Sequence, residues 1–211
     1  MKIVFDFDHT LFSAKRLYLE IKDYFDSLGI SCNLFNKSYQ ESKKEGKTYD
    51  PKKQFEIIHK EKPEVSIKEM EENSEEIMKR FPDFVYPDVV PFLEEFKDRF
   101  DFYIISYGGD DGSFSREKIK RSGIGDYFEK VFVTKSNDKT NALKEVIDGE
   151  EELIFIDDSP EVLSEIKKYF PEVTTVRINR GEGKYKDQSD VKEIDFSIKD
   201  LEELRSILTE L

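Results

Sequence analysis

The chain of 211 residues has little cysteine, no apolar run long enough to cross a membrane, and no N-terminal targeting signal. Cys32 is the only cysteine, so an intramolecular disulfide is excluded, which fits a reducing compartment. The first predicted strand starts almost at Met1 and leaves no room for a signal peptide. We therefore expect a cytoplasmic protein that has no membrane partner.

Positive charge is also scarce relative to negative charge. Lysine and arginine number 34 against 47 aspartates and glutamates, which gives a net charge of −13. Such a chain repels nucleic acids and anionic surfaces, and no basic block with interleaved aromatic residues suggests an exception. We therefore expect no nucleic-acid partner. Aromatic residues are plentiful, with 18 phenylalanines and 10 tyrosines, so a hydrophobic core can form.

The N-terminal stretch combines a predicted strand with two carboxylates. The apolar run Ile3–Phe5 is typical of a strand buried on both faces of a parallel sheet. Asp6 and Asp8 follow it, and residues two apart on a strand point to the same side. Two like charges held close together are costly, so a metal cation or a cationic side chain must offset them. The alternative is a pair of solvated acids that opens a loop.

Residues 13–82 show helical periodicity and no strand signal. Gly29 is suited to end a first helix, Asp50-Pro51 to begin another, and Ser66 to open a capping box with Glu69. The sequence therefore predicts an all-helical insertion directly after the two acids, closed by Pro82. Within it, residues 43–47 (KKEGK) are interpreted as a solvated turn, with phosphate binding as the alternative.

From residue 86 onward, predicted helices alternate with predicted strands. The later strands are predicted at Phe102–Ile105, Val131–Val133, Leu153–Ile156 and Val173–Ile178. This alternation indicates an α/β fold whose parallel sheet is covered on both faces. Right-handed crossovers favour the strand order 5-4-1-2-3, which reverses beside the first strand. Ligands of such sheets bind at that reversal, outside the carboxyl ends of the strands.

Polar side chains gather at those carboxyl ends, and their chemistry predicts a magnesium site that also binds an anion. They are Asp6, Asp8, Ser106, Asp157 and Asp158. Several carboxylates around one point suit Mg²⁺, which takes oxygen ligands and leaves positions for water and phosphate. Zinc is less suited, because His9 is the only histidine or cysteine beside these acids. A hydroxyl, a lysine and backbone N–H groups would bind an oxyanion, which suggests phosphoryl transfer to an aspartate.

Residues 5–11 (FDFDHTL), Ile104–Ser106, Lys139 and residues 155–158 (FIDD) follow one another in this order along the chain. In these four stretches the sequence resembles the haloacid dehalogenase-like (HAD) hydrolases, which are mostly Mg²⁺-dependent phosphatases. Residues 5–11 (FDFDHTL) are similar to the first motif of that family and Ile104–Ser106 to the second. Lys139 is similar to the third motif, with Lys135 as the alternative, and residues 155–158 (FIDD) to the fourth. His9 departs from the family, which more often has glycine there; we expect local packing or hydrogen bonding of His9, with a catalytic role as the alternative.

The resemblance implies a Rossmann-like core over residues 1–12 and 83–211, and a mobile helical cap of the C1 type over 13–82. It implies a phosphatase that hydrolyses a small phosphorylated metabolite through an aspartyl phosphate. A phosphomutase on the same fold and a non-catalytic binding module are the alternatives. Dehalogenases of the family lack the second aspartate, so Asp8 argues against dehalogenation. The oligomeric state is left open.

The resemblance also implies a role for each site residue. Asp6 is the expected nucleophile and Asp8 the acid and base, while Ser106 and Lys139 assist catalysis. The expected phosphate-binding residues are Thr10, Ser106, Tyr107 and Lys139. Asp6, the backbone carbonyl of Asp8, and Asp158 are the expected Mg²⁺ ligands. Asp157 is expected behind the ligands, acting through water or orienting Lys139.

Overall fold

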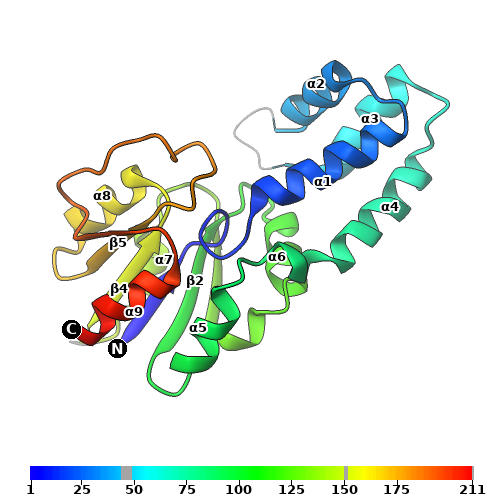
Figure 1. Cartoon of the computed structure of the whole chain (residues 1–211). Helices are drawn as coiled ribbons and strands as arrows, with labels where there is room; N and C mark the ends of the chain where they lie inside the picture. The colour runs from blue at the N-terminus through cyan, green and yellow to red at the C-terminus, as the bar shows by residue number, and fades with distance from the viewer. Residues whose placement is uncertain (44–48, 150–151, 211) are drawn as a thin grey trace.

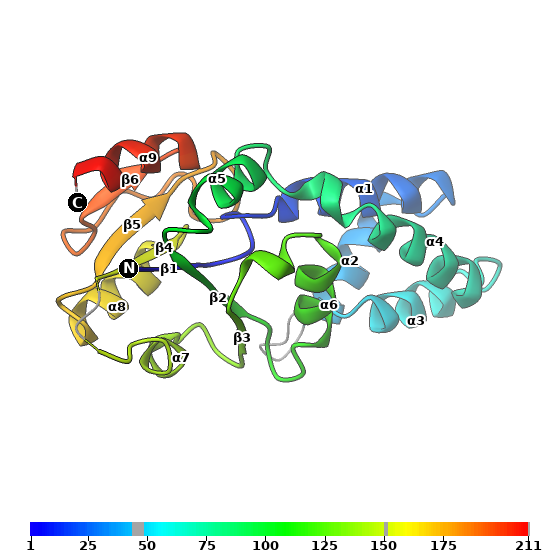
Figure 2. The same cartoon turned by 90° about the horizontal axis from the view of Figure 1, so that it is seen from below.

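The computed structural model describes residues 1–43, 49–149 and 152–210. Figures 1 and 2 show a twisted sheet with helices on both faces and a separate group of helices beside it. The elements of this second group are α1 (Ala14–Ser27), α2 (Cys32–Ser42), α3 (Pro51–Glu61) and α4 (Ile67–Lys79). We call these four helices the helical group.

The sheet is all parallel and has six strands among the described residues, in the order β3-β2-β1-β4-β5-β6. The strands are β1 (Lys2–Phe5), β2 (Asp101–Tyr107), β3 (Lys130–Thr134), β4 (Leu153–Asp157), β5 (Thr174–Ile178) and β6 (Phe196–Ile198). The predicted α/β fold and the predicted order of the first five strands are confirmed. The edge strand β6 was not predicted, because three residues are too few to show a strand period.

Two apolar layers cover the sheet, because alternate residues of each strand point to opposite faces. The covering helices are α5 (Val89–Phe96), α6 (Ser113–Arg121), α7 (Thr140–Lys144), α8 (Pro160–Tyr169) and α9 (Leu201–Glu210). Ile3 and Phe5 pack on the side of α5 and α9, whereas Val4 packs with α7 and α8. Helix α5 ends at Phe96 and α7 at Lys144.

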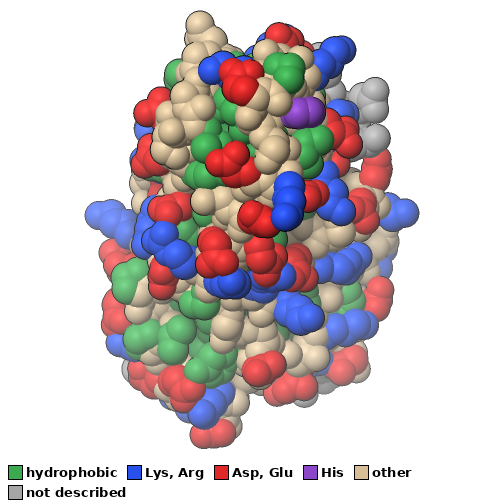
Figure 3. All heavy atoms as spheres, turned by 90° about the vertical axis from the view of Figure 1, so that its right-hand side faces the viewer, with side chains coloured by type: hydrophobic (Ala, Val, Ile, Leu, Met, Phe, Trp, Pro, Cys, Tyr) green, Lys and Arg blue, Asp and Glu red, His purple; other side chains and the backbone are tan. Residues whose placement is uncertain are grey.

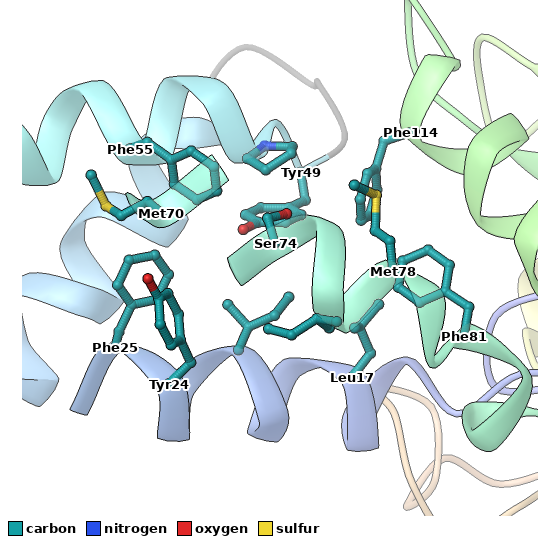
Figure 4. A pocket seen from close by; sticks show the side chains of 13 residues that line it. Leu17, Tyr24, Phe25, Tyr49, Phe55, Met70, Ser74, Met78, Phe81 and Phe114 are labelled. Carbon is teal, nitrogen blue, oxygen red and sulfur yellow. The ribbon is translucent and has the colours of Figure 1, made fainter. Parts of the chain in front are cut away.

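The helical group has an apolar core of its own, built around Phe25, Phe35, Phe55 and Met70. Figure 4 shows side chains of α1 facing those of α3 and α4, with Phe114 of α6 at the edge. The cavity between them measures about 10 Å³, which is too small for a metabolite. On the face seen in Figure 3, which looks onto this group, acidic and basic side chains are interspersed.

The predicted helix boundaries follow from capping. The side chains of Ser13, Asp50 and Ser66 accept hydrogen bonds from backbone N–H groups in the first turns of α1, α3 and α4. Gly29 follows α1 with a φ of +70°, a conformation that favours glycine. The prediction that residues 13–82 are helical is therefore confirmed for the part that the structure describes. No described helix is both long and apolar enough to cross a membrane.

Two linkers join the helical group to the sheet, and they pair with each other. The Ser13 N–H donates to the carbonyl of Phe84 at 2.8 Å, and the Tyr86 N–H donates to that of Leu11 at 3.0 Å. Phe84 ends the short 3-10 helix η1 (Phe81–Phe84) that follows α4. Because the linkers touch, both connections leave the sheet beside Asp8.

Candidate active site

All predicted site residues except Thr10 meet in a cleft of about 580 Å³ between the sheet and the helical group. The residues of the strand ends and adjoining loops that line it include Asp6, Asp8, His9, Ser106, Tyr107, Lys139, Asp157 and Asp158. The strand register explains the convergence, since Phe5 pairs with Ile104 on one side and with Ile156 on the other. Asp6 is therefore level with Asp157, and Ser106 lies one residue further along its strand.

Lys139 joins two of the carboxylates. Its Nζ lies 2.5 Å from Asp6 Oδ1 and 2.7 Å from Asp157 Oδ2, and all three side chains are buried. Burial disfavours the charged lysine, but the two carboxylates outweigh it and raise the pKa of Lys139. Lys139 occupies the N-cap position of α7, where Asp138 accepts the N–H of Thr140. The alternative residue Lys135 is exposed and does not line the cleft.

Asp6, Asp157 and Asp158 form an acidic cluster that suits a cation. Each offers a ligand atom, and these atoms lie within 4.8 Å of one another. Burial, followed by the charges of Asp157 and Asp6, raises the pKa of Asp158 to about 9. Burial also raises the pKa of Asp6 to about 7, against the opposing charge of Lys139. Both carboxylates are therefore costly to ionise in this buried site, a cost that a divalent cation bound by carboxylate oxygens would offset.

Asp157 and Asp158 are placed differently although they are neighbours. Asp157 points inward, where its second oxygen accepts the backbone N–H of Ser159 at 2.8 Å. Asp158 is only partly buried and borders the cleft. Asp157 is therefore paired with Lys139, whereas Asp158 is available to a ligand in the cleft.

Asp8 faces a cation that the sequence did not predict. The Nζ of Lys118 lies 2.5 Å from each carboxylate oxygen of Asp8. The Lys118 side chain is 6% exposed and that of Asp8 is 34% exposed. A signal did exist, because Lys118 follows Phe114 by four residues and precedes Ile119, which places it on the inner side of α6. Without the fold, nothing connects that helix face to Asp8.

The predicted phosphate-binding residues are not all in the cleft. Ser106 and Tyr107 line it, but Thr10 does not. The Thr10 side chain is fully buried, and its hydroxyl has no hydrogen-bond partner among the described residues. Strand β2 ends at Tyr107, and at the next residue, Gly108, a Cβ would lie only 2.1 Å from a Val133 methyl group. Only glycine allows this close approach to β3.

Glu182, in the loop after β5, holds together segments that are far apart in the sequence. Its carboxylate accepts hydrogen bonds from Ser13 Oγ at 2.7 Å and from the Tyr86 hydroxyl, and contacts His9 Nδ1 at 3.3 Å. Burial opposes ionisation, but these hydrogen bonds outweigh it and lower the pKa of Glu182. His9 has a φ of +62°, a conformation that is uncommon outside glycine. Glu182 therefore ties the His9 loop to both linkers.

The helical group contributes an aromatic wall to the same cleft. Tyr18, Tyr39 and Tyr49 line it together with Lys43. The Lys43 ammonium lies 3.9 Å from the centre of the Tyr39 ring, and burial lowers the pKa of Lys43 to about 8. The prediction of a solvated turn is therefore wrong for Lys43, while residues 44–47 lie outside the described residues.

Known proteins with similar folds include several enzymes. No curated protein sequence matches the chain. A haloacid dehalogenase-like hydrolase of Burkholderia xenovorans LB400 is 21% identical, with a TM-score of 0.75 over 99% of this chain and 96% of that one. An L-2-haloacid dehalogenase of Xanthobacter autotrophicus is 14% identical, with a TM-score of 0.61 over 100% and 98%. A β-phosphoglucomutase of Thermotoga maritima is 18% identical, with a TM-score of 0.63 over 100% of both chains.

At these identities the solved structures show a shared fold. The sequence itself goes further, because the profile of one family, described as haloacid dehalogenase-like hydrolase, matches residues 3–168. That segment is well over half of the chain and contains each carboxylate of the cleft. The chain therefore belongs to the haloacid dehalogenase-like hydrolases.

Proposed function

We propose that the protein is a Mg²⁺-dependent phosphatase that hydrolyses a small phosphomonoester through an aspartyl phosphate on Asp6. The observation that carries the proposal is the second acid, Asp8, which faces the same cleft as Asp6. A halide leaves without a proton, so dehalogenation does not need this group. The oxygen of a phosphomonoester leaves readily only when an acid protonates it.

The described geometry supports a role for each residue. Asp6 would attack phosphorus, and Lys139 and Ser106 would bind the phosphoryl oxygens as their charge develops. Asp6, the carbonyl oxygen of Asp8, and Asp158 would hold Mg²⁺. The bound ion would lower the repulsion between the Asp6 carboxylate and the incoming phosphate. Asp8 would protonate the leaving oxygen and then activate the water that hydrolyses the intermediate.

We also propose that the helical group is a cap that selects the substrate. Its residues Tyr18 and Tyr39 line the cleft together with the acids, as do Lys43 and Tyr49, which lie between α2 and α3. Its linkers adjoin Asp8, so its movement would open or close the path to the catalytic groups. A phosphomutase would use the same groups but return the phosphate to its substrate.

The proposed function is tested by a screen of phosphorylated metabolites with Mg²⁺, in which released inorganic phosphate is measured. We expect turnover of at least one phosphomonoester, and no halide release from 2-chloropropionate in a parallel assay. Product analysis by NMR separates the alternatives, because a mutase yields an isomer in place of phosphate. Halide release without phosphate release would contradict the proposal, and binding without turnover would favour the non-catalytic module.

The metal prediction concerns which aspartate binds the ion. Asp158→Asn should weaken Mg²⁺ binding more than Asp157→Asn does, because Asp157 already faces Lys139 and the Ser159 N–H. Turnover should stop in excess chelator and return when Mg²⁺ is restored. Calorimetric Mg²⁺ titration of the two variants measures the difference, and each variant removes one charge, so each controls for the other. The reverse order would reassign the ligand, and turnover after full chelation would exclude the metal.

The pH dependence of Mg²⁺ binding follows from the raised pKa values. The pKa of Asp6 is raised to about 7 and that of Asp158 to about 9, so both are partly protonated without metal at neutral pH. Mg²⁺ needs the ionised forms, so its affinity should rise, and protons should be released, as the pH increases through these values. Asp158→Asn should remove the upper part of this rise. An affinity that does not change with pH would contradict the prediction.

A further inference from the structure

Lys118 is a buried cation that has no role in the proposed reaction as described above. It projects from α6, and its side chain is almost completely shielded from solvent. Burying an ammonium group is costly unless a partner compensates it. That partner is Asp8, whose two carboxylate oxygens both lie 2.5 Å from the Lys118 Nζ.

Three phenylalanine rings fix the ammonium group in place. Its distances to the ring centres of Phe7, Phe12 and Phe114 are 5.7, 5.5 and 5.8 Å, within the range of cation–π attraction. Phe7 and Phe12 stack on each other at 5.2 Å and belong to the same loop as Asp8. The loop that carries the proposed acid therefore also builds the surroundings of Lys118.

The charges in the cleft divide into separate groups. Lys139 is shared between Asp6 and Asp157. A divalent cation at the acidic cluster would compensate Asp6 and Asp158. Asp8 is not a member of that cluster, and Lys118 compensates its charge. Lys118 and Lys139 therefore contact different carboxylates of the cleft.

Lys118 leaves part of the Asp8 carboxylate free to react. Each carboxylate oxygen has two acceptor positions, and one ammonium group cannot fill all four. About a third of the Asp8 side chain is exposed, and Asp8 lines the cleft. Lys118 therefore restrains the carboxylate from behind while its cleft side stays open to the leaving oxygen.

We propose that Lys118 is a positioning residue that holds the Asp8 carboxylate where it exchanges a proton with the leaving oxygen and with the hydrolytic water. This inference rests on the proposed phosphatase activity. Proton transfer needs close approach of the two heavy atoms, and Asp8 without its ammonium partner would be free to rotate. If the role of Lys118 were purely structural, it would anchor α6 to the core. Ile119 of the same helix already packs against the core.

Leaving-group dependence separates the two roles. Phenyl phosphate needs a proton on its leaving oxygen, whereas 4-nitrophenyl phosphate, of similar size, needs it far less. Lys118→Met should lower kcat/KM, which reports the steps up to loss of the leaving group, by about 10- to 100-fold for phenyl phosphate, part of what a placed acid contributes. It should change kcat/KM for 4-nitrophenyl phosphate by less than about threefold. Lys118→Arg, which keeps the charge, should recover part of the loss. Lys120→Met, an exposed position on the same helix, is the matched control and should match the wild type.

A double-mutant cycle tests whether Lys118 acts through Asp8. If it does, adding Lys118→Met to Asp8→Asn should cost little further activity on phenyl phosphate, because the proton donor is already absent. Additive losses, or equal losses of kcat/KM on both esters, would overturn the proposal. If Lys118→Met does not fold in a thermal melt, Lys118→Arg carries the same comparison of the two esters. If the wild-type protein hydrolyses neither ester but is active on other phosphomonoesters, the same comparison is made with an alkyl and an acyl phosphate. If it hydrolyses no phosphomonoester at all, the proposed function is overturned and this inference with it.

Discussion

Asp6→Asn is expected to reduce phosphomonoester turnover by more than about a thousandfold, because loss of a nucleophile removes the reaction path that the rest of the site serves. The amide is a poor nucleophile, and the proposed cation loses a charged ligand. No phosphoenzyme should form. The measurements are phosphate release at saturating Mg²⁺ and intact-protein mass spectrometry after an acid quench, with Lys120→Met as the control for general effects of substitution.

The same substitution should leave the fold intact. Burial raises the pKa of Asp6 to about 7, above its value in an unfolded chain, so ionised Asp6 destabilises the metal-free native state once the pH exceeds the unfolded value. This penalty is fully present above pH 7 and disappears as the pH falls to the unfolded value. At pH 8, metal-free Asp6→Asn should therefore melt no lower than the wild type. Lost activity together with a lowered melting temperature would indicate misfolding in place of lost chemistry, and retained turnover would exclude Asp6 as the nucleophile.

The sheet could be predicted from the sequence because its strands are short apolar runs separated by helical periodicity. Ile3–Phe5 and Leu153–Ile156 are such runs, and the acids that follow them reach the cleft as the parallel order requires. The edge strand β6 escaped prediction because Phe196–Ile198 is too short, and its neighbour β5 determines its position. Local patterns therefore sufficed wherever an element was long enough to show its period.

The partners of the acids could not be predicted from local patterns. Lys118 is 110 residues from Asp8 in the chain, and Glu182 is 173 residues from His9. Each contact depends on how loops and helices pack, and on nothing that a motif encodes. Thr10 illustrates the converse, since it lies inside a motif but its buried side chain does not line the cleft. The sequence indicated which residues line the cleft, whereas the structure was needed to find what contacts them.

Asp8→Asn should separate the two steps of the reaction. The variant keeps Asp6, the backbone carbonyl of residue 8 and Asp158, so substrate and Mg²⁺ binding should persist. Turnover of alkyl phosphates should fall by about two to four powers of ten, the usual contribution of a positioned acid or base. With acyl phosphates, the rate of the first step, phosphoryl transfer to Asp6, should fall less, because their leaving group needs little protonation.

With acetyl phosphate, Asp8→Asn should therefore accumulate phosphoenzyme, since Asp6 can still attack while hydrolysis of the intermediate lacks its base. Removal of Asp8 also leaves the ammonium group of Lys118 without its carboxylate partner, so part of any loss of stability comes from this buried charge. The double variant Asp8→Asn with Lys118→Met controls for that effect and should accumulate phosphoenzyme as well. Intact-protein mass spectrometry after an acid quench measures the adduct, and peptide mapping locates it. Phosphate on a residue other than Asp6, or undiminished turnover of alkyl phosphates by Asp8→Asn, would overturn the assignment of nucleophile and acid.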